Sequence, residues 1–144
     1  IAHDRDKTLL TEIGVLKVIE KDLLCVHEDG TLKDLIQAIS KSKRNIFPII
    51  NSEEELMGVI LLDDVRHLIF KPENYGIELK ALMHPPPAFV NFDEHLDTVM
   101  DKFDSTNAWN LPVLKEGKYY GFLSKSKIFT VYRDKLSCSN DIDF

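Results

Sequence analysis

Residues 45–64, NIFPIINSEEELMGVILLDD, decide the fold of this chain. Two apolar runs, 46–50 and 56–62, flank a polar break, and β-rich runs on either side of a polar turn predict a pair of adjacent strands. The two aspartates that close the stretch begin a segment whose apolar residues recur at helical spacing. The stretch therefore predicts a β-hairpin that leads directly into a helix.

The same order of elements occurs a second time at residues 110–123. Pro48 and Pro112 lie 64 residues apart. Gly58 and Gly121 lie 63 residues apart, because the second turn is one residue shorter. Identical residues are few, but apolar positions, prolines and glycines recur in step. This pattern predicts one fold that is built twice.

Each repeat is expected to run strand, helix, strand, strand, helix. The first strand is expected at 23–27, and the following helix begins at Thr31, whose capping box is completed by Asp34. In the second repeat we expect Asp93 to cap the corresponding helix, and the last helix to run from Lys127 to about Lys135. The predicted divisions of the chain are a linker at 1–15, repeat one at 16–70, repeat two at 79–133 and a tail at 134–144.

Composition narrows the class of protein. The chain has 144 residues, 44% hydrophobic and 29% charged, as expected for one ordinary domain or two small lobes with a common core. The net charge of −6 argues against a nucleic-acid partner, which needs a clustered cationic face. No apolar run approaches the roughly 20 residues of a membrane helix.

Cysteines and histidines suggest no metal site and no disulfide. Cys25 lies in an apolar run and is expected to be a small buried residue, whereas Cys138 lies in a polar tail. Two free thiols fit a reducing cytoplasm. The five histidines lack the spacing of metal ligands and are expected at the surface.

The duplicated order, with a proline in the first hairpin strand and a glycine in the second, resembles a CBS-domain pair, or Bateman module. The matching stretches are 47–50 with 58–60, and 111–114 with 121–123. A narrower resemblance, to the cytoplasmic tail of bacterial CLC-type chloride channels and transporters, rests on residues 40–48, 61–66 and 121–129.

The resemblance implies an α+β fold of tandem βαββα repeats related by a pseudo-twofold axis, with two clefts between them. It implies a regulatory module that senses adenine nucleotides (ATP, ADP or AMP) and requires no cofactor. The expected partners are a second copy of the chain, bound through the CBS helices, and the transmembrane part of the parent chain. The expected location is the cytoplasmic side of an inner-membrane protein.

In the family, the cleft motif is Gly-x-hydrophobic-Ser/Thr-x-x-Asp, in which the aspartate binds ribose hydroxyls and the Ser/Thr contacts phosphate or sugar. Here the motif is split between the repeats. Repeat one has Asp64 but Leu61 at the Ser/Thr position, and repeat two has Ser124 but Lys127 at the aspartate position. The resemblance assigns one cleft to Asp64, Pro86, Pro87, Ala88, Trp109 and Asn110, and the other to Asp22, Leu23, Arg44, Asn45, Ser124 and Lys127.

Each of these residues also has a simpler interpretation. Asp64 at a helix start is equally a cap or a first-turn anion. Lys127 and Arg44 are equally solvated cations, and Trp109 is equally a core or interface aromatic. We expect no enzyme, because no P-loop, no Gly-x-Gly-x-x-Gly and no paired nucleophile and base are recognisable.

Two further functions stay open. The pair could act as a scaffold without a ligand, which dimerises through apolar helix residues such as those at 128–132. The same module could also belong to another transporter class or to a soluble enzyme.

Overall fold

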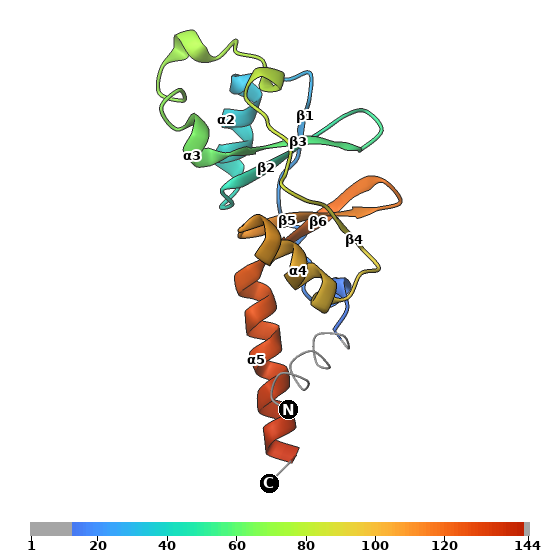
Figure 1. Ribbon diagram of the computed structural model, residues 1–144. Helices are drawn as coiled ribbons and strands as arrows, with labels where there is room; N and C mark the ends of the chain where they lie inside the picture. The colour runs from blue at the N-terminus through green and yellow to red at the C-terminus, as the bar shows by residue number, and fades with distance from the viewer. Residues whose placement is uncertain (1–12, 143–144) are drawn as a thin grey trace. The chain divides into compact units, whose positions relative to one another are not determined.

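The computed structural model describes residues 13–142, with side chains through Ser137 (Figure 1). Most of the predicted linker, His3 and the side chain of Cys138 lie outside this described part. The described chain forms two compact units. No helix within residues 13–142 is long and apolar enough to cross a membrane.

The first unit comprises residues 22–86 and the hairpin tip 116–119. Its sheet has the order β1-β2-β3, with β1 parallel to β2 and β2 antiparallel to β3. Its elements are β1 (Val26–His27), α2 (Leu32–Lys41), β2 (Ile46–Ile50), β3 (Leu56–Leu61), α3 (Leu62–Val65) and two 3-10 turns, η2 (Pro72–Asn74) and η3 (Leu79–Ala81). The apolar core joins α2 to the sheet through fully buried side chains, among them Leu32, Leu35, Phe47 and Ile49.

The second unit comprises, within the described chain, residues 13–21, 87–115 and 120–142. Its sheet has the order β4-β5-β6, again with the first strand parallel to the second. Its elements are η1 (Val15–Lys17), β4 (Val90–Asn91), α4 (Leu96–Thr106), β5 (Asn110–Lys115), β6 (Lys118–Ser124) and α5 (Lys125–Ile142). The predicted α+β order, βαββα twice, is therefore confirmed.

Each sheet also receives the segment that leads into the other repeat in sequence. Glu20 bridges to Phe122 at the edge of β6, and His84 bridges to Val59 in β3. In both bridges the backbone N–H groups donate in both directions over 2.8–3.1 Å. The compact units therefore do not coincide with the repeats in sequence.

These leading segments explain the matched hairpin glycines. A Cβ on Gly121 would lie 2.8 Å from the Glu20 carbonyl oxygen and from the side chain of Ile19. A Cβ on Gly58 would lie 3.1 Å from the His84 carbonyl oxygen. The glycines are needed because another backbone passes directly over the strand.

Helix starts agree with the sequence in one repeat and differ in the other. The Asp34 carboxylate accepts the Thr31 N–H at 2.9 Å, which confirms the predicted capping box. The prediction that Asp93 caps α4 was wrong, because the N-cap is His95. A turn closed by Glu94 N–H on the Asn91 carbonyl moves the helix start downstream.

Helix lengths also differ from expectation. α5 continues to Ile142, past Lys135, because neither proline nor glycine interrupts that stretch. The helix predicted to follow the first hairpin is short: α3 ends at Val65, and the chain continues as turns, where the Asn74 side chain donates to the Leu68 carbonyl at 3.2 Å.

The first strand and its cysteine are the remaining differences. β1 covers only two residues of the five predicted. Cys25 is exposed, so the expectation of a buried residue was wrong. Four histidines, those at 27, 67, 84 and 95, are exposed as expected.

Candidate functional site

Each unit has a junction where the last strand of its sheet passes directly into a helix. At the first junction, Leu62 N–H donates to the Asn45 carbonyl at 2.8 Å. At the second, Lys125 N–H donates to the Trp109 carbonyl at 2.9 Å. The same backbone contact therefore builds both junctions. Several of the predicted site residues lie at these junctions.

The first junction presents a carboxylate. Asp64 is the third residue of α3, and its side chain is about half exposed at 49%. The N-cap of α3 is Leu61 and forms no side-chain cap, so Asp64 does not cap this helix. The His84 Nε2 atom lies 3.4 Å from an Asp64 carboxylate oxygen. The imidazole comes from the leading segment of repeat two.

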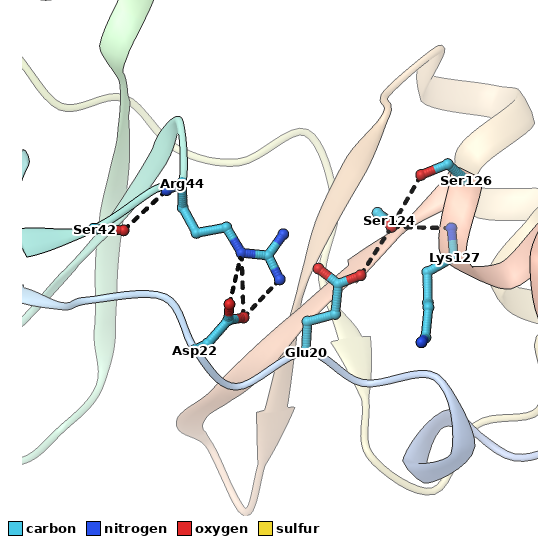
Figure 2. Close-up of polar contacts among 7 residues, drawn as sticks. All are labelled: Glu20, Asp22, Ser42, Arg44, Ser124, Ser126 and Lys127. Carbon is cyan, nitrogen blue, oxygen red and sulfur yellow. Dashed lines mark hydrogen bonds and ion pairs between the residues drawn. The ribbon is translucent and has the colours of Figure 1, made fainter.

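The second junction presents a hydroxyl that is already engaged (Figure 2). The Ser124 Oγ accepts the Lys127 N–H at 3.1 Å and so caps the first turn of α5. It also donates to the Glu20 carboxylate at 3.2 Å. The side chain of Lys127 is exposed. This junction therefore pairs a cap with a carboxylate from the leading segment of repeat one.

Arg44 forms a short, two-pronged ion pair with Asp22, another of the predicted residues (Figure 2). Its guanidinium donates to both carboxylate oxygens of Asp22, at distances from 2.6 to 3.2 Å. These hydrogen bonds lower the pKa of Asp22 below its ordinary value. Ser42 Oγ accepts the Arg44 backbone N–H at 3.0 Å. The positive charge of Arg44 is therefore largely offset by Asp22 within the first unit.

Trp109 is not a core residue. Its side chain is 73% exposed, and the Lys125 Nζ atom lies 5.6 Å from its ring centroid. This geometry is a cation–π contact at the start of α5. The ring keeps most of its surface accessible, as a stacking platform requires.

The predicted site residues divide between the two units. Asp64, Pro86, Asp22, Leu23, Arg44 and Asn45 belong to the first unit, and Pro87, Ala88, Trp109, Asn110, Ser124 and Lys127 belong to the second. Within the first unit the structure brings Asp22 and Arg44 together, and within the second it brings Ser124 and Lys127 together. The side chain of Leu23 is buried and offers no polar group. The two clefts stay predictions.

The sequence model of the CBS domain matches residues 15–71 and, a second time, residues 79–134. The chain belongs to the CBS domain family. Over 50 residues it is 32% identical to the carnitine transport ATP-binding protein OpuCA of Listeria monocytogenes. That match covers 35% of this chain and only 13% of the curated relative.

Two solved CBS structures show the same fold. One is the CBS domain of a bacterial CNNM/CorC family Mg2+ transporter in complex with ATP, with a TM-score of 0.75 and 16% identity, covering 88% of this chain and 91% of the other. The second is the CBS domain of a CBS domain containing membrane protein from Sphaerobacter thermophilus, with a TM-score of 0.75 and 14% identity, covering 90% and 93%. At these identities the likeness establishes the fold alone.

Sequence reasoning missed two residues at the junctions of the CBS pair. Glu20 contacts Ser124, and His84 contacts Asp64, each from the leading segment of the other repeat. The two residues lie 64 apart, the same offset as the hairpin prolines. The repeat offset of 64 residues could therefore have identified Glu20 and His84 as equivalent positions. Each leading segment, however, contacts a sheet that is distant in sequence, and periodicity within a segment does not report such a contact.

Proposed function

We propose that this chain is the regulatory, ligand-sensing CBS module of a membrane transport protein, and that its ligand is an adenine nucleotide: ATP, ADP or AMP. The support is that two of the similar proteins, the carnitine transport protein OpuCA and the CNNM/CorC family Mg2+ transporter, serve transport. The CBS domain of the Mg2+ transporter is in complex with ATP. Nucleotide binding would act by favouring one arrangement of the repeats, which requires different affinities for two arrangements.

The observation that carries the proposal is the state of Asp64. Its carboxylate does not cap α3 but lies in the first turn of that helix, as the first-turn interpretation expected, and it is half exposed there, so its oxygens stay accessible. Two carboxylate oxygens suit the two hydroxyls of a ribose. In the second unit, the exposed ring of Trp109 is a separate argument for a nucleotide ligand, since it offers the kind of aromatic surface that a purine stacks on.

For the parent chain we propose a CLC-type chloride channel or transporter, with the module on the cytoplasmic side of the inner membrane. The support is the resemblance at residues 40–48, 61–66 and 121–129. The named relatives belong to other transport classes, so the parent is tested separately. The reading frame upstream of Ile1 should encode a series of apolar helices; without them the CLC parent is wrong.

The test of nucleotide binding is calorimetric titration of the chain with ATP, ADP and AMP. We expect Asp64→Asn to weaken binding about tenfold or more, because the amide carries no charge and replaces one of the two acceptor oxygens with a donor group. The matched control is Asp63→Asn, because Asp63 is an adjacent exposed carboxylate that pairs with Arg66 at 2.6 Å. Equal affinities for both variants, or no heat with any nucleotide at millimolar concentration, would contradict the proposal.

A second candidate function is the scaffold that dimerises without a ligand. Phe129 on α5 is 56% exposed and packs edge-on against Tyr132, with ring centroids 6.4 Å apart. An exposed aromatic pair on a long helix suits a twofold interface. Ile128, which the sequence also assigned to this face, is buried in the core of its unit.

A further inference from the structure

The first unit contains a groove between the edge strand β1 and helix α2. Its volume is about 480 Å³. One wall is the extended stretch 24–27, and the other is formed by Asp34, Gln37, Ala38 and Lys41. These four residues fall at i, i+3, i+4 and i+7, which is one face of α2. The groove is therefore bounded by a strand edge and a helix face.

The strand edge in this groove has open hydrogen-bonding groups. Glu28, just after β1, donates its N–H to the Ile50 carbonyl of β2 at 2.8 Å. Backbone hydrogen-bonding groups alternate in direction along an extended stretch, so those of Val26 also point towards β2. The backbone N–H and C=O groups of Cys25 and His27 point away from β2. Among the described residues, no partner bonds the His27 N–H or the Cys25 carbonyl. The extended stretch 24–27, which includes β1, thus offers one donor and one acceptor at the groove.

The second unit has the same edge, and there both groups are bonded. Asn91 N–H donates to the Glu94 carboxylate at 2.6 Å. The Lys102 ammonium donates to the Phe89 carbonyl at 2.7 Å and to Glu94 at 2.8 Å. A Glu–Lys pair therefore covers the outward donor and acceptor of β4.

The first repeat lacks this pair. Gly30 and Ala38 occupy the positions 64 residues before Glu94 and Lys102, and both line the groove. Neither side chain can bond the strand edge. Because repeat one has Gly30 and Ala38 in place of a glutamate and a lysine, the edge of β1 stays open, whereas the edge of β4 is covered. An open strand edge is a template for another strand.

We propose that this groove binds an extended peptide, which adds to β1 as an antiparallel fourth strand of the sheet. The peptide residue opposite Val26 would be flanked by two residues that form the hydrogen bonds. One contributes a carbonyl to the His27 N–H, and the other contributes an N–H to the Cys25 carbonyl. The peptide backbone thus replaces the contacts that Glu94 and Lys102 form in repeat two.

The charges on α2 set the direction of the added strand. The turn after β1 places Asp34, in the first turn of α2, at the His27 end of the groove. Lys41 is the last residue of α2, about 10 Å further along the helix axis, towards Leu24. Lys41 forms no ion pair within the described residues. An antiparallel peptide therefore places its free ammonium near Asp34 and its free carboxylate near Lys41.

The test uses amide 1H–15N spectra of the 144-residue chain. The probe is a mixture of random tetrapeptides with free ends, because four extended residues span about 13 Å, close to the separation of Asp34 and Lys41 along α2. The comparison probe is the same mixture acetylated and amidated. We expect the free mixture to shift the amide signals of residues 24–27 and 34–41. The blocked mixture should need at least a fivefold higher concentration for the same shift. Absence of shifts at these residues, or equal responses to the two mixtures, would overturn the proposal.

Three variants locate the binding in the groove. Ala38→Lys gives repeat one the lysine of repeat two and should weaken the response at least tenfold while the other signals stay native. Lys41→Gln should remove the preference for free carboxylates. Lys33→Gln removes a charge from the same helix outside the groove and should behave as wild type. A wild-type response from Ala38→Lys would overturn the proposal. If that variant does not fold, the proposal is overturned when Lys41→Gln still prefers peptides with a free carboxylate.

Discussion

At the scale of single residues, Cys25 shows that exposure and reactivity differ. Its sulfur is only partly covered, and this partial desolvation, followed by the negative charge of Glu54, raises the pKa of the Cys25 thiol to about 11. Burial disfavours the charged thiolate, so the shift is upward. The reactive form is therefore scarce at neutral pH, although the residue is exposed.

We predict slow thiol chemistry at Cys25, measured in a Cys138→Ser variant that leaves one cysteine. At pH 8 its reaction with Ellman's reagent should be about a hundredfold slower than in the urea-unfolded chain, because an ordinary thiol has a pKa of about 8.5. The rate should rise about tenfold for each pH unit until near pH 11. A rate that levels off near pH 9 would show that the thiol is not desolvated.

At the scale of elements, the contact between a leading segment and its sheet depends on a glycine. We predict that Gly121→Ala lowers the free energy of unfolding by about 1–3 kcal/mol, because the new methyl group would meet the Glu20 carbonyl and Ile19 at 2.8 Å. Thermal and urea denaturation measure this change.

The matched control for that glycine is Gly76→Ala. No heavy atom lies within 4 Å of a Cβ built at Gly76, and its backbone is not left-handed. This substitution should change the free energy of unfolding by no more than about 0.5 kcal/mol. If both variants lose the same free energy of unfolding, the close approach of Glu20 and Ile19 is not the reason that position 121 needs glycine.

Elements were predictable where a local cause defines them. The hairpins and the Thr31 capping box follow from residues close together in sequence, and the structure confirms them. The start of α4 was not predictable from Asp93, because a backbone turn at Asn91 decides it. Likewise Glu20 and His84 reach their junctions through bridges to strands far away in sequence, which no local pattern reports.

The candidate site was predictable only in part for the same reason. The sequence motif singled out Asp64 and Ser124, and the family resemblance added Arg44; their role in binding stays a prediction. The sequence did not show that Asp22 already pairs with Arg44, or that Ser124 caps α5 and contacts Glu20. Such pairings decide which charges are available to a ligand, and they depend on side-chain geometry.

At the scale of the whole molecule, the scaffold function makes a prediction of its own. Phe129→Ser should weaken self-association at least tenfold by sedimentation velocity, because it removes an exposed apolar ring from α5. The stability of the chain should change little, since the ring is 56% exposed.

The control for Phe129 is Leu16→Ser, because Leu16 has nearly the same exposure, 57%, and lies on η1 of the same unit. It should leave the association constant unchanged. If the two variants associate equally, or if the wild-type chain is monomeric at high concentration, α5 is not a dimer interface.

The exchange of leading segments also has a mechanical consequence. A tensile force applied to the backbone ahead of Ile13 is transmitted along residues 13–20. It acts on β6 through the Glu20–Phe122 bridge before it acts on β1. Tension from an upstream anchor would therefore strain the later repeat first, even though the earlier one is attached to it in sequence.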